Sequence, residues 1–219
     1  MLQTVCQQPF HDRMSAATAK SAQHIDRMRT NEYLCMTTQS NDTTMDFLQI
    51  AKRRYACRQY QDRKVEPEKL EAILEAGRVA PTGANRQPQR LIVVESAEGM
   101  ERLARCTRDF KAPCAIIVCA DTDEVWCRKY DGKKIGDIDA SIVTDHMMLM
   151  AASLGLDTLW VCMFKPDAVR EEFVLPPHVE PVNILFIGYG AGEPASPERH
   201  DQTRKPLCET VFHETYGAK

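Results

Sequence analysis

The central stretch of the sequence reads Ala80-Pro81-Thr82-Gly83-Ala84-Asn85-Arg86-Gln87-Pro88-Gln89. Pro81 has no amide hydrogen and cannot continue a helix, and Gly83 is able to adopt a positive φ. The side chains of Thr82, Asn85 and Gln87 carry hydrogen-bond donors and acceptors without charge. The stretch therefore predicts a loop that suits a planar ring with polar edges. The same residue types are equally typical of an ordinary surface turn.

A helix is predicted immediately before this loop. Pro67 suits the first helical position, where no intrahelical bond needs its amide. The apolar residues that follow share one helical face: Leu70, Ile73, Leu74 and Gly77. Because Pro81 cannot extend the helix, the loop begins where this helix stops.

Three apolar runs predict buried strands. Residues 91–94 are apolar on both faces and predict a central strand. Residues 115–120 and 183–190 repeat the pattern of a buried strand. Between the first two runs, Ser96 predicts the N-cap of a helix over residues 97–106.

The longest predicted helix covers residues 137–154. Its first turn carries Asp137 and Asp139, whose charges suit the positive end of a helix, and Gly155 predicts its end. Few polar positions interrupt its apolar residues, so we expect this helix to be buried. Residues 121–136, which precede it, are polar and irregular and predict either a lid or a simple connection.

The chain divides into two regions of different composition. Residues 1–44 are polar, balanced in charge and without a sustained apolar period. Such a segment buries too little apolar surface to offset the entropy of ordering it, so we expect a poorly ordered N-terminal extension. Residues 45–219 carry all the core-like patterns and form the predicted functional domain.

Composition excludes several classes of partner. The net charge of −3 supplies no basic excess for phosphate backbones, so we expect no nucleic-acid partner. No apolar run reaches the length of a membrane span, and the N-terminus lacks a signal-peptide pattern. The nine cysteines include no C-x-x-C pair, and several lie within apolar runs. We therefore expect free thiols, no metal site, no membrane contact and a reducing, cytoplasmic location.

Basic residues gather at two places in the predicted domain. A short helix predicted over residues 45–54 ends in a basic run, and Arg54 and Arg58 are four positions apart. If the backbone here is helical or turns tightly, both guanidinium groups can hold one phosphate. The alternative is a basic helix end favoured by the helix dipole. The cluster around Arg204 is, on composition alone, better explained as a charged loop in solvent.

Patterns that mark other enzyme classes are missing from the sequence. No G-x-G-x-x-G or G-x-x-x-x-G-K-[ST] phosphate loop occurs. The six histidines lack zincin spacing, and no G-x-S-x-G elbow is present. Hydrolase and metalloenzyme interpretations are therefore weak.

Four segments resemble, in the same order, motifs of the nitroreductase family of flavin mononucleotide (FMN) enzymes. Residues 80–88 are similar to A-P-S-x-x-N-x-Q-P, and residues 54–60 to R-R/H-S-x-R/K-x-F/Y. Residues 155–164 are similar to G-L-x-T-x-W-x-x-x-F, and residues 204–207 to the start of R-x-P-L-E-E. The chain departs from the usual family residues at four positions: Tyr55, Ala56, Gln89 and Cys162.

The resemblance implies a cofactor site assembled from all four segments. The residues implied for the FMN phosphate and ribityl chain are Arg54, Tyr55, Ala56, Arg58 and Arg204. The residues implied for the flavin ring are Pro81, Thr82, Gly83, Asn85, Gln87, Val161 and Cys162.

The resemblance also implies a fold and a reaction. The implied fold is α+β, with three layers, a central mostly antiparallel sheet flanked by helices, and an intertwined homodimer that holds FMN at the subunit interface. NAD(P)H, as co-substrate, would reduce FMN, which would then reduce a nitroaromatic, quinone or related small-molecule electron acceptor by a ping-pong mechanism. Because the flavin carries the chemistry, no catalytic side chain is assigned. The alternatives are another flavin reaction, such as reductive dehalogenation or heterocycle oxidation, and a non-catalytic flavin-binding protein.

Overall fold

The computed structural model describes residues 46–218. The predicted N-terminal extension therefore lies outside the described residues. The described elements are, in chain order, α2 (Phe47–Arg53), α3 (Pro67–Val79), η2 (Gly83–Asn85), β1 (Gln89–Val94), α4 (Ala97–Cys106), β2 (Cys114–Asp121), α5 (Gly136–Ser153), β3 (Asp157–Val161), α6 (Pro166–Glu172), β4 (Val179–Gly188), α7 (Arg199–Thr203) and α8 (Leu207–Thr210). The predicted helices and strands occur in this order as α2, α3, β1, α4, β2, α5 and β4, and β3 falls in the segment 155–164 that was identified by resemblance.

The four strands form one antiparallel sheet in the order β1-β2-β4-β3. The prediction that residues 91–94 form a central strand is wrong, because β1 lies at an edge of the sheet. Its apolar character on both faces has another cause. Leu91 and Val93 pack against one hydrophobic cluster, whereas Ile92 packs against the other. Both faces of the sheet are thus covered even at this edge. The apolar pattern of β1 therefore reflects burial of both its faces and not a central position in the sheet.

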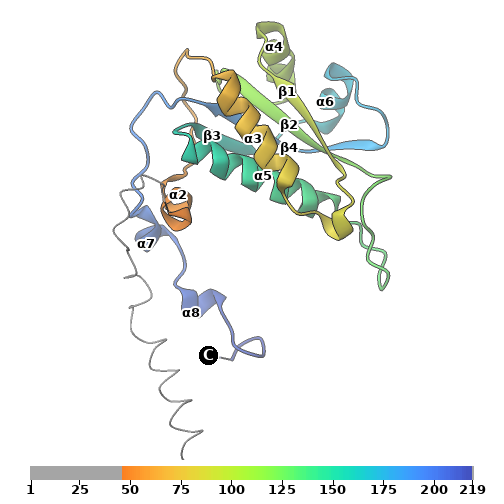
Figure 1. Cartoon of the computed structure of the whole chain (residues 1–219), viewed down its shortest axis with the longest axis vertical. Coiled ribbons are helices and arrows are strands. Elements are labelled where there is room, and N and C mark those ends of the chain that lie inside the picture. The colour runs from red at the N-terminus through yellow and green to blue at the C-terminus, as the bar shows by residue number, and fades with distance from the viewer. Residues whose placement is uncertain (1–45, 219) are drawn as a thin grey trace, which may run out of the picture. The chain divides into compact units, whose positions relative to one another are not determined.

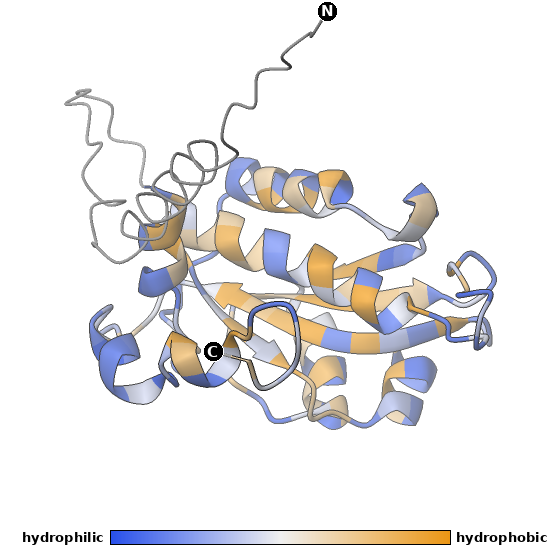
Figure 2. Ribbon diagram, turned by 90° about the horizontal axis from the view of Figure 1, so that it is seen from below, coloured by the Kyte–Doolittle hydropathy of each residue, from blue (hydrophilic) through white to orange (hydrophobic). Residues whose placement is uncertain are grey.

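The core consists of two hydrophobic clusters separated by the sheet. Successive residues of β2 point to opposite faces, so Ile117 belongs to one cluster and Ile116 and Val118 to the other. Helices α4 and α6 cover the first cluster with residues such as Leu103 and Val169. Helices α3 and α5 cover the second. Figures 1 and 2 show the resulting three layers, with the sheet between the two pairs of helices.

Helices α3 and α5 pack closely against each other. Ile73 is completely buried, and a Cβ atom added at Gly77 would lie 2.9 Å from Met147 Cγ. The predicted ends of these helices are confirmed: Pro67 occupies the start of α3, and Gly155 follows α5 with a φ of 76°. This helix pair matters for function because the Ala80–Gln89 loop follows α3 directly and, as shown below, is fastened to α5.

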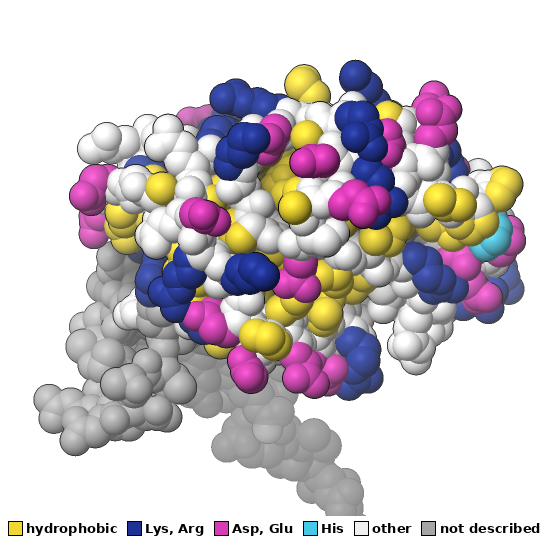
Figure 3. All heavy atoms as spheres, turned by 90° about the horizontal axis from the view of Figure 1, so that it is seen from above, with side chains coloured by type: hydrophobic (Ala, Val, Ile, Leu, Met, Phe, Trp, Pro, Cys, Tyr) yellow, Lys and Arg dark blue, Asp and Glu magenta, His cyan; other side chains and the backbone are white. Residues whose placement is uncertain are grey.

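Charged side chains of both signs are interspersed on the face shown in Figure 3, with hydrophobic side chains between them. This face therefore presents no extended region of one sign that would attract a polyanion. Within residues 46–218, no helix combines the length and the apolar character that crossing a bilayer requires.

Candidate functional site

The loop after α3 has an unusual backbone. Three of its residues that are not glycine, Ala84, Asn85 and Gln87, adopt φ values of 49°, 54° and 52°. Asn85 N donates to Thr82 O at 3.0 Å, and Gln87 N donates to Thr82 Oγ1 at 3.1 Å. Left-handed conformations of side-chain-bearing residues cost about 1–3 kcal/mol each and cluster at ligand sites. The loop is therefore a strained, internally bonded structure rather than an ordinary turn.

Gly83 serves this loop in a way that the sequence did not reveal. Gly83 is able to adopt a positive φ, but the positive φ values of this loop belong to its neighbours instead. It is needed for space: an added Cβ would lie 2.5 Å from Ile135 Cδ1 and 3.1 Å from Trp126 Cβ. Its amide donates to the carboxylate oxygen Asp139 Oδ1 at 2.9 Å. The loop is thus fastened to the first turn of α5 through a buried acid.

The strand β3 brings two of the predicted cofactor segments together. Cys57 N donates to Thr158 O at 2.9 Å, and Ala56 bridges Thr158 in parallel orientation. At the end of β3, Val161 is buried, whereas the next residue, Cys162, is exposed. The segment after α2 and the exposed end of β3 therefore border one region of the surface.

The predicted pairing of Arg54 with Arg58 on a helix or tight turn is wrong. Helix α2 ends at Arg53, and the following residues are extended, as the bridges at Ala56 and Tyr60 show. In an extended chain, residues four apart are separated by about 13 Å. Arg58 Nη1 instead donates to Ala56 O at 3.3 Å. Extended backbone forms here because this segment joins the sheet edge.

Arg54 is grouped instead with two arginines from the C-terminal part of the chain. Burial, followed by the positive charges of Arg199 and Arg204, lowers the pKa of Arg54, and Asp145 opposes this effect. Among residues 46–218, no group accepts a hydrogen bond from the Arg54 guanidinium. Arg54, Arg199 and Arg204 thus form an arginine group in which two cations act on the third and one acid opposes them. Such an arrangement favours the binding of an anion, and phosphate suits the planar guanidinium donors.

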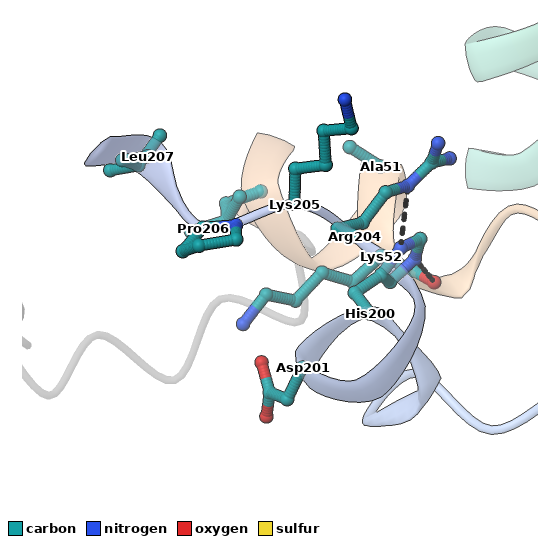
Figure 4. Close-up of a pocket in the computed structure, with 9 residues that line it drawn as sticks. Ala51, Lys52, His200, Asp201, Arg204, Lys205, Pro206 and Leu207 are labelled. Atoms are coloured by element: carbon teal, nitrogen blue, oxygen red, sulfur yellow. Dashed lines mark hydrogen bonds between the residues drawn. The ribbon is translucent and has the colours of Figure 1, made fainter. Parts of the chain in front are cut away.

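A cavity of about 860 Å³ lies beside this arginine group, between α2 and residues 200–207. Figure 4 shows the Arg204 side chain directed toward His200, which in turn reaches the carbonyl at the end of α2. Arg204 Nε donates to His200 Nδ1 at 3.4 Å, and His200 Nε2 lies 3.1 Å from Lys52 O. Lys52 and Lys205 add two further cations to the cavity lining.

Comparison with known proteins identifies the family to which these features belong. The model of the nitroreductase family matches residues 51–110 and 104–189. A putative NADH dehydrogenase/NAD(P)H nitroreductase of Methanothermobacter thermautotrophicus is 32% identical over 170 residues, which cover 73% of this chain and 85% of that protein. The chain belongs to the nitroreductase family.

Solved structures of the family share the fold described above. A nitroreductase family protein from Clostridium difficile 630 is 58% identical, with a TM-score of 0.77 over 78% of this chain and 99% of that one. An FMN-dependent nitroreductase from Clostridium difficile R20291 is 27% identical, with a TM-score of 0.64 over 77% of this chain and 99% of that one. The three-layer α+β fold that the sequence motifs implied is therefore the nitroreductase fold.

The arginine group and the Ala80–Gln89 loop lie at different places along α5 of this nitroreductase. The loop is fastened near the start of α5 at Asp139. Helix α2 lies beside the later part of α5, where Phe47 and Ile50 line a cavity with Leu149 and Met150. From Asp139 to Met150 the helix rises about 16 Å. Figure 1 shows the same arrangement, with the residues that follow α3 at one end of α5 and α2 with α7 toward the other.

Several residues of this nitroreductase's candidate site were missed from the sequence. Asp139 was interpreted only as a helix-dipole charge, and Arg199, His200, Lys52 and Lys205 were not singled out. The basic composition of residues 199–205 was a usable signal for Arg199, His200 and Lys205, as the basic end of α2 was for Lys52, but nothing local identifies which of them lie near Arg54. The fold alone brings them to α2.

Two buried oxygen atoms near the loop have no hydrogen-bond partner among the described residues. They are Asp139 Oδ2 and Gln89 Oε1. Gln89 stands at the start of β1. This corner of the nitroreductase therefore has spare hydrogen-bond acceptors beside the strained loop.

One group of potential metal ligands occurs within residues 46–218. It consists of Asp121, Asp123 and His178, whose ligand atoms lie within 4.8 Å of one another. Arg90 Nη2 already pairs with Asp121 Oδ2 at 2.8 Å, and Asp123 N donates to Asp121 Oδ1 at 3.1 Å. These contacts satisfy the buried carboxylate without an ion.

Proposed function

We propose that this nitroreductase family member is an FMN-dependent oxidoreductase that takes hydride from NAD(P)H and reduces nitroaromatic, quinone or related acceptors. The observation that carries the proposal is the arginine group, because no described residue accepts a hydrogen bond from the Arg54 guanidinium, and Arg204 donates to a described residue only through Nε, to His200. The donor set fits one phosphate monoester. The neutral, strained loop fits the polar edge of a flavin ring. FMN, when bound, supplies reversible two-electron chemistry.

The chain's own residues have binding and positioning roles in this proposal. Arg54 and Arg204 bind the phosphate, and Tyr55, Ala56 and Arg58 border the ribityl chain. The residues proposed for the ring are Pro81, Thr82, Gly83, Asn85, Gln87, Val161 and Cys162. Since hydride transfer between two cofactors needs position and exclusion of water, no side-chain acid or base is required.

We also propose that the site is completed by a second copy of the chain. Within one chain, the loop is fastened to the start of α5, whereas the arginine group is attached to the end of α2, which lies beside the later part of α5. An apolar surface lies between them, with Phe47, Val79 and Ile138 exposed by 66%, 59% and 46%. Its cavity of about 470 Å³ is mostly apolar. A homodimer that covers this surface would remove these side chains from water and bring the loop of one copy to the arginines of the other.

We place the protein in the reducing cytoplasm. Cys57, Cys106, Cys114 and Cys119 are buried and free. Burial raises the pKa of Cys114 and of Cys119 to about 12, so these thiols stay protonated and inert. Cysteines used as core side chains suit a compartment in which disulfides do not form.

The cofactor assignment is tested on the purified full-length protein. We expect the two-band absorption of oxidised flavin and release of FMN on heating, identified by chromatography against FMN and FAD standards. FAD, or no flavin after incubation with FMN, contradicts the proposal.

Steady-state kinetics separate the enzymatic function from its alternatives. We expect oxidation of NAD(P)H that accelerates when a quinone or nitroaromatic compound is added. A protein that binds FMN but does not oxidise NAD(P)H with any acceptor would be a flavin-binding protein without turnover. Turnover confined to halogenated compounds or peptide heterocycles would favour another flavin reaction on the same fold.

A further inference from the structure

Arg199 joins two segments that are far apart in the sequence. Its Nη2 donates to Arg54 O at 2.6 Å, and its Nη1 donates to Lys52 O at 3.0 Å. The same Nη1 also reaches Ser196 O at 2.8 Å and Ala195 O at 3.4 Å. One side chain therefore connects the end of α2 with the segment that leads into α7.

These contacts satisfy a specific need of the protein. The last carbonyls of a helix have no intrahelical partner, and Lys52 O and Arg54 O lie at the end of α2. A guanidinium group presents several donors in a fixed plane and can hold carbonyls from two segments at once. A lysine ammonium offers no such fork. His200, the next residue, makes a second contact with Lys52 O at 3.1 Å.

The attachment determines where Arg204 lies. Arg204 follows α7 directly, its amide donates to His200 O at 3.0 Å, and its Nε donates to His200 Nδ1 at 3.4 Å. Arg204 is thus fixed to the short helix that Arg199 fastens to α2. On the other side, Arg199 holds the carbonyl of Arg54 itself. Both phosphate-binding arginines of the proposed function are therefore positioned through this one guanidinium.

We propose that Arg199 is a positioning residue for the phosphate group of the cofactor. It holds Arg54 and Arg204 side by side while its own donors are occupied by backbone carbonyls. This inference rests on the proposed function, because it concerns the same phosphate site. It adds a residue outside the four motifs that resemble the family.

The electrostatics agree with this role. Burial is the largest cause of the lowered pKa of Arg54. The positive charges of Arg199 and Arg204 are the next largest. The attachment therefore holds like charges together against their repulsion. Binding of a phosphate relieves that repulsion, so a chain without the attachment should lose affinity for phosphate in particular.

The test compares FMN with riboflavin, which has the same ring and ribityl chain but no phosphate. Dissociation constants are measured by flavin fluorescence on full-length protein freed of flavin. We expect Arg199→Gln to raise the dissociation constant of FMN about tenfold, which corresponds to about 1.4 kcal/mol, and that of riboflavin by less than about twofold. The FMN dissociation constant of Arg199→Lys should lie between those of Arg199→Gln and the wild type.

A matched control is Arg105→Gln. Arg105 also forms a bidentate side-chain contact, with Glu172, but on the α4 and α6 side of the sheet. It should change neither dissociation constant. Unfolding temperatures of all variants are recorded, and if Arg199→Gln does not fold, the comparison is made with Arg199→Lys.

Each outcome decides between distinct conclusions. If wild-type protein does not bind FMN, the proposed function itself is wrong. If wild-type protein binds FMN and the Arg199 variants bind it equally well, only the positioning role is wrong. Equal weakening of FMN and riboflavin also contradicts the inference, because it indicates a general structural defect rather than loss of the phosphate site.

Discussion

The two halves of the proposed cofactor site are built in different ways. The ring side is the Ala80–Gln89 loop, which is continuous in sequence, follows α3 and is bonded to buried Asp139 of α5. The phosphate side is assembled from residues about 145 positions apart, which meet through backbone carbonyls near the surface. The ring side is therefore a largely exposed loop fastened to the core through a buried acid, whereas the phosphate side is held by hydrogen bonds between surface segments.

This difference determines what a substitution can disturb. A change beneath the ring side should alter the stability of the whole fold together with cofactor affinity, since the same buried groups serve both. A change on the phosphate side should alter affinity with little loss of stability, because the hydrogen bonds of Arg199 and Arg204 go to backbone carbonyls and to His200 near the surface. The following predictions test this separation, beginning with the largest expected effect.

Ile73→Ala tests the dependence of the ring side on the core. Ile73 is completely buried on α3, the helix that leads directly into the loop. Removing its side chain should lower the free energy of unfolding by about 2–5 kcal/mol, as is usual for a buried aliphatic truncation. Urea denaturation measures the change, and Glu75→Ala on the exposed face of the same helix is the control, for which little change is expected because an exposed ion pair contributes little to stability. A similar loss in both variants would refute the assignment of Ile73 to the core.

Arg54→Ala tests the independence of the phosphate side. Hydrogen bonds to charged groups contribute about 1.5–3 kcal/mol, so the FMN dissociation constant should rise about ten- to a hundredfold. Because the substitution removes a charge from among like charges, the free energy of unfolding of flavin-free protein should change by about 0.5 kcal/mol or less. Arg58→Ala is the matched comparison. Because the Arg58 guanidinium donates a hydrogen bond to Ala56 O, its removal should have a smaller effect on FMN affinity. A large loss of stability in Arg54→Ala would mean that the phosphate side also belongs to the core.

Asp139→Ala tests the connection between loop and core directly. It leaves the Gly83 amide without its acceptor, which should cost about 1–3 kcal/mol of unfolding free energy. The affinities for FMN and for riboflavin should fall together, because the ring is common to both. Asp139→Asn retains an oxygen at Oδ1 and should lose less unfolding free energy and less affinity for both flavins. If only FMN binding weakened, the loop would have to be assigned to the phosphate side instead.

The sequence predicted the fold well because its signals were local. Pro67, Ser96 and Gly155 mark helix ends through their own backbone chemistry, and the structure confirms each position; Ser96 Oγ, for example, accepts from Gly99 N at 3.1 Å. The apolar runs identified β1, β2 and β4 in the same way. Their order in the sheet was not local information, and for this reason residues 91–94 were placed wrongly at the centre.

The candidate site could also be predicted only where its signals were local. The loop was found from its composition, but the burial of Asp139 and the space occupied by Ile135 around Gly83 depend on how α5 packs against it. Arg54 and Arg204 were identified from motifs, whereas Arg199 makes its contacts only because the C-terminal segment returns to α2. Contacts between distant segments are what a single sequence does not show.

Deletion of residues 1–44 should have the smallest effect. The described members of both hydrophobic clusters, the loop and the arginine group lie after Met45. The deleted segment carries no motif and no sustained apolar period, so it is expected to add few buried contacts. Chains with and without it should agree in flavin content, oligomeric state by size exclusion with light scattering, and rate of NAD(P)H oxidation. Loss of FMN together with dissociation of an oligomer would show that the N-terminal segment takes part in the subunit interface. Loss of FMN with the oligomer intact would show that it reaches the cofactor site itself, and in either case the two-part description of that site would need a third element.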